Sequence, residues 1–238
     1  MAMKVVILAG GLGTRISEET ADKPKPMVLI AGKPMLWHLM SIFAKQGFNE
    51  FIVATGFKSE VIEGWIKTVK EPWDIKALNT GLNTQTGGRI LECMKSVPGE
   101  RVFATYGDGL GNINLKALID FHDHQGKLAT VTAVRPPARF GVLESQNGLV
   151  VRFGEKNQVD AGWINGGFFV LEPQVASYIY NLDEPLESGA LPRLVEERQL
   201  VSYHHDGFWQ PMDTLREKED LERFALLNPP LWLAGLPN

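Results

Sequence analysis

A glycine-rich loop near the start of the chain could hold phosphate groups. It follows a short apolar run and reads Gly10-Gly11-Leu12-Gly13-Thr14-Arg15. Glycines let the backbone approach a ligand closely and aim its N–H groups at phosphate oxygens, and the planar guanidinium of Arg15 suits the same anion. The loop is therefore a candidate anion site; a plain tight turn is the alternative that the glycines alone would also fit.

A second basic segment follows ten residues later. It reads Lys23-Pro24-Lys25-Pro26-Met27, and each lysine precedes a proline. A residue before proline is biased towards extended backbone, and alternate side chains of an extended chain share a face. We therefore expect Lys23 and Lys25 to point into one pocket, with a solvated basic loop as the alternative.

Two aspartates could serve phosphate chemistry, which needs negative charge neutralised around the reacting phosphorus. Asp108 lies between Gly107 and Gly109 directly after an apolar run, and we expect these glycines to leave room for a metal and its waters. Mg²⁺ favours one or two carboxylates together with substrate phosphates. Asp213 precedes the last helical segment, so it is either the cap of that helix or a second ligand of the cation.

Two familiar phosphate-binding motifs do not fit this loop. The P-loop needs a Lys-Ser/Thr pair after its last glycine, and none follows here. The dinucleotide fingerprint needs a third glycine, where this chain has Ile16, and an acid about 20 residues later, where it has the Lys-Pro-Lys-Pro segment. These departures argue against an NAD-dependent oxidoreductase.

The elements that must position these residues alternate in the first half of the chain. We expect buried strands at 5–9, 51–55, 75–78, 102–106 and 129–134, with helices at 34–46, 60–66, 89–95 and 115–124. Thr86 and Asn114 are expected to cap the last two of these helices. The alternation predicts an α/β fold: one Rossmann-like, doubly wound, mostly parallel mixed sheet with helices on both faces. Such folds bind ligands at the carboxyl edge of the sheet.

The pattern changes after about residue 135. Asn147-Gly148 between two apolar runs predicts a hairpin, and residues 164–171 read as a strand interrupted by Gly166-Gly167. Helices are expected at 173–180, 191–197 and 215–227, and a strand at 200–203. No long linker separates the parts, so residues 1–238 are expected to form a single domain whose second half adds a substrate lobe.

Composition excludes several classes of protein. Hydrophobic residues make up 44% and charged residues 22%, the net charge is −4, and there is one cysteine, Cys93. The acidic balance argues against a nucleic-acid binder, and a single cysteine excludes an intrachain disulfide. No apolar run approaches the roughly 20 residues of a membrane span, so no membrane partner and a cytoplasmic location are expected. Met1-Ala2 are read as vector residues before a native start at Met3.

Taken together, the motifs resemble those of the sugar-1-phosphate nucleotidyltransferases. The resemblance rests on the glycine loop with Arg15, the Lys-Pro-Lys-Pro-Met segment, residues 86–89, 105–109, 137–141 and 164–171, and the block from Gly207 to Thr214. Ser17-Glu18-Glu19-Thr20 together with Lys-Pro-Lys-Pro-Met is similar to the glucose-1-phosphate cytidylyltransferase branch of that family.

This resemblance implies transfer of CMP from CTP to α-D-glucose 1-phosphate or a related hexose 1-phosphate, with release of pyrophosphate. It implies that Asp108 and Asp213 hold Mg²⁺ and that Arg15 and Lys25 hold the triphosphate; these four residues are the expected catalytic set. The halves 1–135 and 136–238 are expected to bind nucleotide and sugar respectively. The implied nucleotide contacts are Leu8, Ala9, Gly10, Gly11, Leu12, Gly13, Thr14, Arg15, Lys25, Thr84, Arg89 and Gly107. The implied sugar-phosphate contacts are Gly141, Glu155, Lys156, Asn165 and Gly166.

Some alternatives stay open at this point. We expect Arg89 to read the O2/N3 edge of cytosine, but uridylyl- and thymidylyltransferases use the same scaffold, and Arg89 could also be a cation on the helix surface. A homo-oligomer is expected, although the segment 68–73 is shorter than the subunit-contact excursion of relatives in this branch. A regulator that binds nucleotide sugars without catalysis is the alternative from another class, and it has no need of the pair of aspartates.

Overall fold

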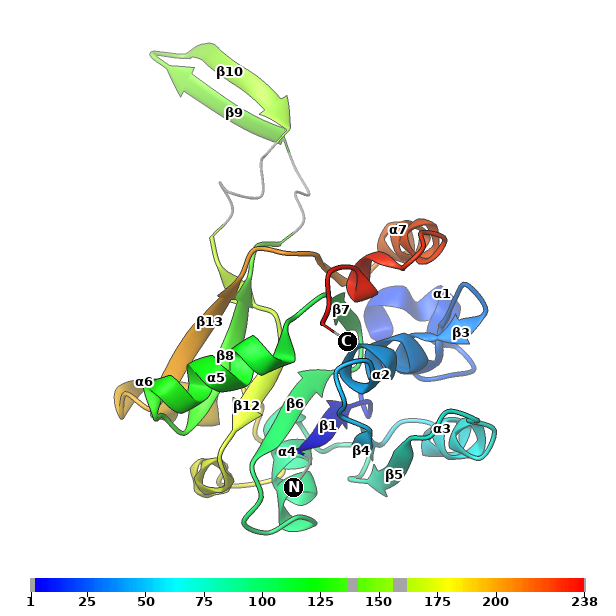
Figure 1. Ribbon diagram of the computed structural model, residues 1–238. Helices are drawn as coiled ribbons and strands as arrows, with labels where there is room; N and C mark the ends of the chain where they lie inside the picture. Colours follow the sequence, from blue (N-terminus) through cyan, green and yellow to red (C-terminus); the bar gives the residue numbers. More distant parts are fainter. Residues whose placement is uncertain (1–2, 137–140, 156–161, 238) are drawn as a thin grey trace.

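The computed structural model describes residues 3–136, 141–155 and 162–237; for residues 15, 141–145 and 152–155 the description covers the backbone alone. Eight strands of this described chain form one sheet, whose path runs β11-β8-β12-β6-β1-β4-β5, while β13 also pairs with β8 (Figure 1). These strands are β1 (Lys4–Leu8), β4 (Glu50–Thr55), β5 (Asp74–Asn79), β6 (Val102–Tyr106), β8 (Ala129–Val134), β11 (Ile164–Asn165), β12 (Phe169–Leu171) and β13 (Leu200–His205).

The sheet is mixed but mostly parallel. The pairs β1–β4, β1–β6, β4–β5 and β8–β13 are parallel, whereas β12 runs antiparallel to both β6 and β8, and β11 antiparallel to β8. The predicted α/β fold class is confirmed. Because β6 and β1 are neighbours, the loops after them lie side by side at the carboxyl edge.

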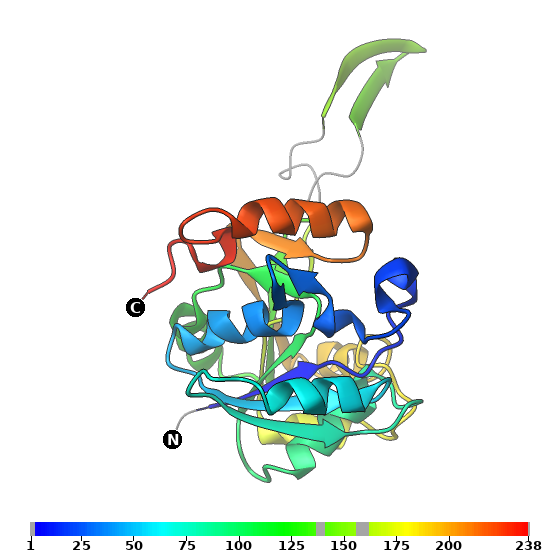
Figure 2. The same cartoon turned by 90° about the vertical axis from the view of Figure 1, so that its right-hand side faces the viewer.

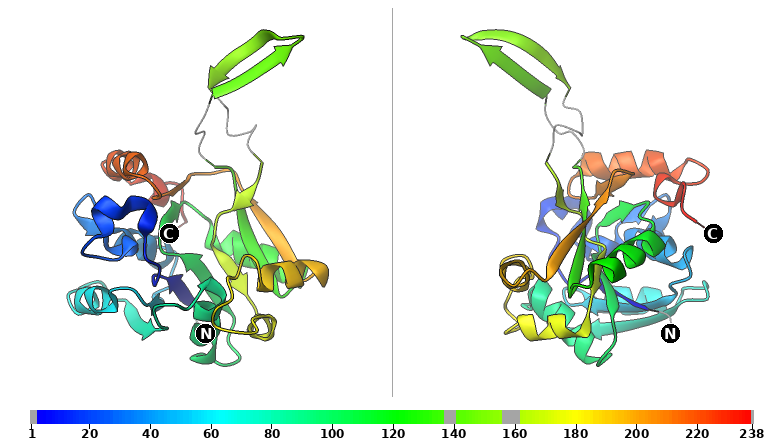
Figure 3. Two further views of the ribbon diagram at one scale, coloured as in Figure 1. Left: turned by 180° about the vertical axis from the view of Figure 1, so that it is seen from behind. Right: turned by 60° about the vertical axis from the view of Figure 1, so that its left-hand side comes forward.

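Helices cover both faces of the sheet, as the sequence predicts. The core cluster on one face includes residues of α2 (Met35–Ala44), α3 (Ser59–Ile66), α5 (Leu115–Gln125) and α7 (Leu215–Ala225). The cluster on the other face includes residues of α4 (Thr86–Lys95) and α6 (Ala190–Glu196). Figure 2 looks onto the face that carries α2 and α3 (blue and cyan), with α7 above them, and the right panel of Figure 3 shows α5 along the sheet beside β8 and β13.

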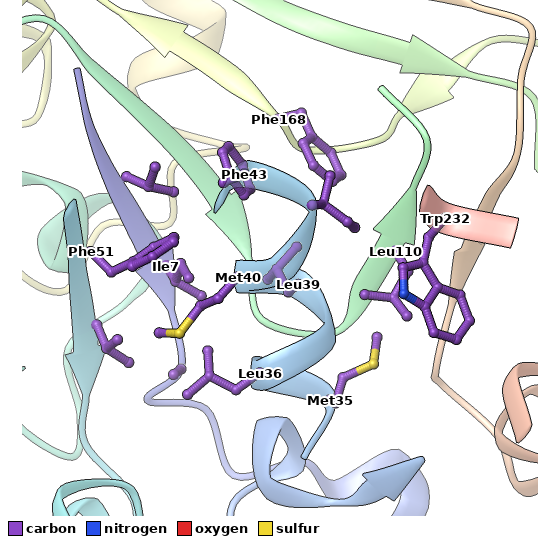
Figure 4. Packing of buried hydrophobic residues seen from close by; sticks show 14 of the residues in the cluster. Ile7, Met35, Leu36, Leu39, Met40, Phe43, Phe51, Leu110, Phe168 and Trp232 are labelled. Carbon is purple, nitrogen blue, oxygen red and sulfur yellow. The ribbon is translucent and has the colours of Figure 1, made fainter. Parts of the chain in front are cut away.

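Side chains of β1 point alternately to the two faces of the sheet and so contribute to both core clusters. Val5 and Ile7 pack in the cluster with α2, whereas Val6 packs in the cluster with α4. Figure 4 shows the layer around α2, where Phe43 stacks on Phe168 with ring centroids 5.5 Å apart. Since Phe43 belongs to the first half of the chain and Phe168 to the second, one core cluster contains residues of both.

The predicted hairpin is confirmed in β9 (Gly141–Gln146) and β10 (Leu149–Glu155), which pair with each other in a separate two-stranded sheet. Asn147 and Gly148 both have positive φ, 50° and 84°, as a tight two-residue hairpin turn requires. The hairpin stands apart from the main sheet in all views (Figures 1, 2 and 3).

Shorter elements complete the description. They are 3-10 helices at Thr14–Ile16, Lys25–Met27, Pro173–Tyr178 and Leu231–Leu233, helix α1 (Ser17–Thr20), and strands β2 (Leu29–Ile30), β3 (Lys33–Pro34), β7 (Gly109–Gly111) and β14 (Trp209–Pro211). No helix among the described residues is both long and apolar enough to cross a membrane.

Two local expectations are wrong. The helix expected at 173–180 is the shorter 3-10 helix Pro173–Tyr178, because Ile179 already has extended backbone. Thr86 does not cap α4: it is the first residue of the helix, and its hydroxyl contacts the segment around Leu186 instead. Asn114, by contrast, caps α5 as predicted, since its side chain accepts a hydrogen bond from the backbone N–H of Ala117.

Candidate functional site

A cavity of about 600 Å³ opens at the carboxyl edge of the sheet. Its walls come from the loops after β1, β5 and β6 and from two more distant segments. The lining residues are Leu8 to Thr14, Lys25, Pro26, Leu82 to Thr86, Arg89, Tyr106, Gly107, Asp108 and Asp213. Most residues predicted to bind nucleotide therefore share one cavity.

The glycine loop is held in shape by neighbouring backbone. Ala9 donates its N–H to the carbonyl of Ala54, 2.9 Å away, so the loop leaves β1 still attached to β4. Gly13 has a φ of 65°, and a Cβ there would lie 3.1 Å from Cβ of Lys25. Glycine at 13 thus allows the loop to reverse directly over Lys25.

Lys25 joins two distant carboxylates at one end of this cavity. Its Nζ lies 2.6 Å from Oδ2 of Asp108 and 2.7 Å from Oδ1 of Asp213. Burial by itself would lower the pKa of Lys25, but the attraction and hydrogen bonds of the two aspartates outweigh burial and raise it above its ordinary value. The two carboxylates converge on one point, so a single cation can contact both.

A small antiparallel ladder brings the aspartates together. β14 pairs with β7, with Pro211 opposite Gly109, and the N–H of Met212 donates to the carbonyl of Asp108 at 2.9 Å. Asp213 does not cap the last helix. Thr214 does so, in a capping box with Glu217, which leaves the carboxylate of Asp213 turned to Lys25.

The basic segment differs from the prediction. Lys25 begins a 3-10 turn, and this turn breaks the extended alternation that would have put Lys23 and Lys25 on one face. Nζ of Lys23 instead lies 3.4 Å from Oδ1 of Asp22, and Lys23 is not among the residues that line the cavity. The expectation of a shared pocket is therefore wrong for Lys23.

Gly107, which precedes Asp108, has a packing role. A Cβ at Gly107 would lie 2.7 Å from the carbonyl oxygen of Leu8 and 2.8 Å from Cγ of Pro26. The N–H of Gly107 donates to that same carbonyl of Leu8. Gly107 thus lets the end of β6 pack against the end of β1 and against Pro26. That the glycines around Asp108 leave room for a metal stays a prediction.

Arg89 lies in the cavity wall but binds protein groups. Nη1 donates to the carbonyl of Thr55 and to Oγ1 of Thr80, at 2.9 and 2.6 Å. Nη2 donates to the carbonyls of Gly10 and Leu82, at 3.0 and 3.3 Å. Burial lowers the pKa of Arg89 from its ordinary value. The guanidinium ties the glycine loop to the loop after β5, and it is not a surface cation.

The remaining predicted residues divide between cavity and second half. Thr84 lines the cavity, and its hydroxyl donates to the carbonyl of Thr80. Asn165 ends β11, where it pairs with Ala133 of β8, and its side chain donates to the hydroxyl of Tyr106. Gly166 follows and donates its N–H to the carbonyl of Thr132 in β8. Gly141 and Glu155 pair in the hairpin backbone. The side chains of Arg15 and Glu155, and all of Lys156, lie outside the described residues.

Sequence reasoning missed two residues beside the site, Tyr106 and Glu187. The hydroxyl of Tyr106 donates to Oε1 of Glu187 at 2.6 Å. Burial raises the pKa of Tyr106 strongly, and the neighbouring carboxylate of Glu187 raises it further. Tyr106 could have been noticed because it ends a strand just before the Gly-Asp-Gly turn. Glu187 has no local signal in the sequence.

The known proteins that this chain resembles are nucleotidyltransferases. A family model described as "Nucleotidyl transferase" matches residues 4–216. The chain is 44% identical to the glucose-1-phosphate cytidylyltransferase of Salmonella typhi over 243 aligned positions, which cover 92% of this chain and 95% of that one. It is also 44% identical, with the same coverage, to the glucose-1-phosphate cytidylyltransferase of Salmonella typhimurium.

A solved structure shares the fold over nearly the whole chain. HddC from Yersinia pseudotuberculosis, complexed with GMP-PN, superposes with a TM-score of 0.72 at 25% identity. The match covers 93% of this chain and 98% of that one. The similarity of fold thus extends over most of both halves of the chain.

Proposed function

Because the chain belongs to the nucleotidyl transferase family, we propose that it transfers CMP from CTP to a hexose 1-phosphate, α-D-glucose 1-phosphate first, and releases pyrophosphate. The 44% identity to glucose-1-phosphate cytidylyltransferases supports this choice of base and sugar. The observation that carries the proposal is the convergence of Lys25, Asp108 and Asp213 at the end of a cavity of about 600 Å³.

The reaction needs positioning and charge neutralisation more than acid–base chemistry. A phosphate oxygen of the hexose 1-phosphate forms a bond to the α-phosphorus of CTP. The bond from that phosphorus to the bridging oxygen breaks, and pyrophosphate leaves with the electron pair. The attacking oxygen is already anionic, so no side chain has to remove a proton from it.

The donor set at Asp108 and Asp213 fits a hard divalent cation. Both carboxylates reach one nitrogen, that of Lys25, so oxygen ligands of the kind that Mg²⁺ prefers already converge. We propose that Asp108 and Asp213 would hold Mg²⁺, which when bound would neutralise phosphate charge around the α-phosphorus. Lys25 would then turn its ammonium from the carboxylates to phosphate oxygens.

The other residues of the cavity would orient the nucleotide. The N–H groups of the glycine loop, which lines the cavity, would meet phosphate oxygens, and Arg15 stays a prediction for the triphosphate. Arg89 would act through the carbonyls of Gly10 and Leu82 and so fix the spacing of the two loops. Direct contact of Arg89 with the base stays a prediction. In the structure, its four Nη hydrogen bonds are to protein groups.

The test is pyrophosphate release from a panel of nucleotides and sugar phosphates. We expect CTP with α-D-glucose 1-phosphate to give the highest kcat/KM, at least about tenfold above UTP, dTTP and GTP, and activity to cease when a chelator removes Mg²⁺. A tenfold preference for another nucleotide would overturn the choice of base. Nucleotide-sugar binding without pyrophosphate release from any pair would favour a non-catalytic regulator.

A further inference from the structure

A segment of the second half, residues 181–189, packs against the N-terminal end of α4; we call it the strap. Its carbonyls accept hydrogen bonds from the N-terminal end of α4: Leu182 from the N–H of the N-cap residue Gln85 at 2.9 Å, and Glu184 from the N–H of Gly87 at 3.1 Å. A Cβ on Gly88 would lie 2.2 Å from the carbonyl oxygen of Leu182. The double glycine therefore allows the strap backbone to lie directly on the helix.

The strap is fixed at several further points. The buried carboxylate of Glu184 pairs with Arg193 of α6, and Leu186 is fully buried. The N–H of Leu186 donates to Oγ1 of Thr86 at 2.8 Å. A segment held in this way can present the next side chain in a defined position.

That next side chain is Glu187, and two hydroxyl groups orient its carboxylate. Tyr106 donates to Oε1 at 2.6 Å, and Thr86 donates to Oε2 at 2.7 Å. The hydroxyl of Tyr106 in turn accepts from Nδ2 of Asn165 at 2.9 Å, while Oδ1 of Asn165 accepts from the N–H of Gly167. Four side chains from separate parts of the chain thus form one hydrogen-bonded row.

The carboxylate of Glu187 keeps capacity for a ligand. An ionised carboxylate has about four acceptor sites, and the two hydroxyls use one on each oxygen. Glu187 is exposed, while Tyr106 and Thr86, which hold it, both line the cavity. The carboxylate therefore lies beside the cavity, bonded to two of its lining residues, with about two acceptor positions available to a ligand.

The ligand group that fits is a neutral donor. A carboxylate repels phosphate, so a phosphate group is excluded as its partner. Hydroxyl groups on adjacent carbons of a sugar ring supply two donors at a spacing that one carboxylate can accept. Tyr106 reaches Asn165 of β11, and in the sheet β11 lies on the opposite side of β6 from β1 and the glycine loop. This placement favours the hexose over the ribose.

We propose that Glu187 binds ring hydroxyl groups of the hexose, and that Tyr106 and Thr86 are the residues that position its carboxylate. The inference rests on the proposed function. It adds a specificity-determining contact from the strap to the sugar contacts expected at 141, 155, 156, 165 and 166.

The experiment compares Glu187→Gln with the wild-type enzyme. The amide keeps the size of the side chain but loses the charge that strengthens hydrogen bonds from hydroxyls. We expect KM for α-D-glucose 1-phosphate to rise at least about tenfold, while KM for CTP stays within about twofold. Monodeoxy analogues of glucose 1-phosphate identify the hydroxyls. For the wild type, KM should rise when the hydroxyl bound by Glu187 is missing, whereas for the variant KM should be the same with and without that hydroxyl.

The matched control is Glu197→Gln. Glu197 accepts a hydrogen bond from the hydroxyl of Tyr178, the same pair of residue types, and neither lines the cavity. This variant should change neither KM. Both variants should melt within a few degrees of the wild type, so that a loss confined to Glu187→Gln is not a loss of folding.

Binding of CDP-glucose and CMP separates this inference from the proposed reaction. Glu187→Gln should bind CDP-glucose at least about tenfold more weakly than the wild type and CMP equally well. Equal affinity of both proteins for CDP-glucose, or an equal loss for CMP, would overturn the sugar contact, the latter by pointing to the ribose. Absence of pyrophosphate release by the wild type would instead overturn the proposed reaction and leave this comparison of affinities to decide the contact.

Discussion

Lys25 and Arg89 each place a buried cation in the wall of the same cavity, but different partners hold them. Lys25, 8% exposed, lies between two carboxylates, and these raise its pKa. Arg89, 4% exposed, donates to three backbone carbonyls and one hydroxyl, and burial lowers its pKa. An ammonium that shares its carboxylates can exchange them for phosphate oxygens and a metal. A guanidinium on backbone carbonyls is part of the framework.

The comparison teaches that charge alone does not identify a reactive residue in this cleft. The partners of Lys25 are side chains that another cation could take over, so it belongs to the chemistry. The partners of Arg89 are three backbone carbonyls and one threonine hydroxyl of the surrounding loops, so it belongs to the shape of the cavity. The following variants test that division.

Lys25→Ala should have the largest effect on activity. It removes the cation that we assign to the phosphates, and kcat should fall at least about 10²–10³-fold in an assay of pyrophosphate release. The control is Lys23→Ala, two positions away and outside the cavity lining, which should keep kcat within about twofold. Near wild-type turnover by Lys25→Ala would remove this lysine from the mechanism.

Arg89→Ala should act mainly on stability. The variant loses four hydrogen bonds that join neighbouring loops, and it empties the space of a buried side chain. The free energy of unfolding, measured with urea, should therefore fall by about 2–4 kcal/mol. Cys93, four residues later on α4, offers a second readout: its thiol is buried, and burial raises its pKa to about 12. At pH 8 the wild-type thiol is protonated and should resist iodoacetamide, whereas Arg89→Ala should be labelled faster as α4 loosens.

The control for that experiment is Lys95→Ala on the same helix, whose exposed side chain contacts Glu92. It should change neither the unfolding midpoint nor the labelling of Cys93. Arg89→Ala with unchanged stability and a loss confined to KM for the nucleotide would show that Arg89 contacts substrate directly.

Thr214→Ala should have the smallest effect and the most local one. Loss of the cap of α7 should cost about 1 kcal/mol of unfolding free energy. Glu217 of the same capping box accepts from the N–H of Asp213, so kcat should also fall a few-fold as that residue loses support. Asn114→Ala removes the cap of α5 instead, and should cost similar stability with kcat unchanged. An equal fall in kcat for both variants would show a general effect of capping.

Much of the fold could be predicted because it depends on local patterns. The apolar run at Val5 to Ala9, the strand before Gly107 and the Asn147-Gly148 turn each carry their own signal in residue type and spacing. The convergence of Asp108 and Asp213 followed from a family resemblance, since no local rule relates residues so far apart in the sequence.

What could not be predicted depends on tertiary partners. The extended backbone expected at Lys25 gave way to a 3-10 turn, which turns its side chain towards Asp108 and Asp213. The sequence allows Arg89 to be a base-reading residue or a cation on a helix surface. Its role in joining two loops depends on the carbonyls of Gly10 and Leu82, which only the folded chain brings to it. Tyr106 and Glu187 are 81 positions apart. Their contact exists because the strap rests on glycines that have no side chain to hold it away.

The register of the short ladder between β7 and β14 decides which residue of the second strand's continuation lies beside the carboxylate of Asp108. Pro211 faces Gly109, and two positions later the chain delivers Asp213 to the same nitrogen that Asp108 contacts. Adding or deleting one residue between 209 and 212 would offer Met212 or Thr214 at that place, and it would also displace the buried side chain of Met212 or the cap of α7. In this chain, tolerance to insertions should therefore drop sharply in the short ladder of β7 and β14.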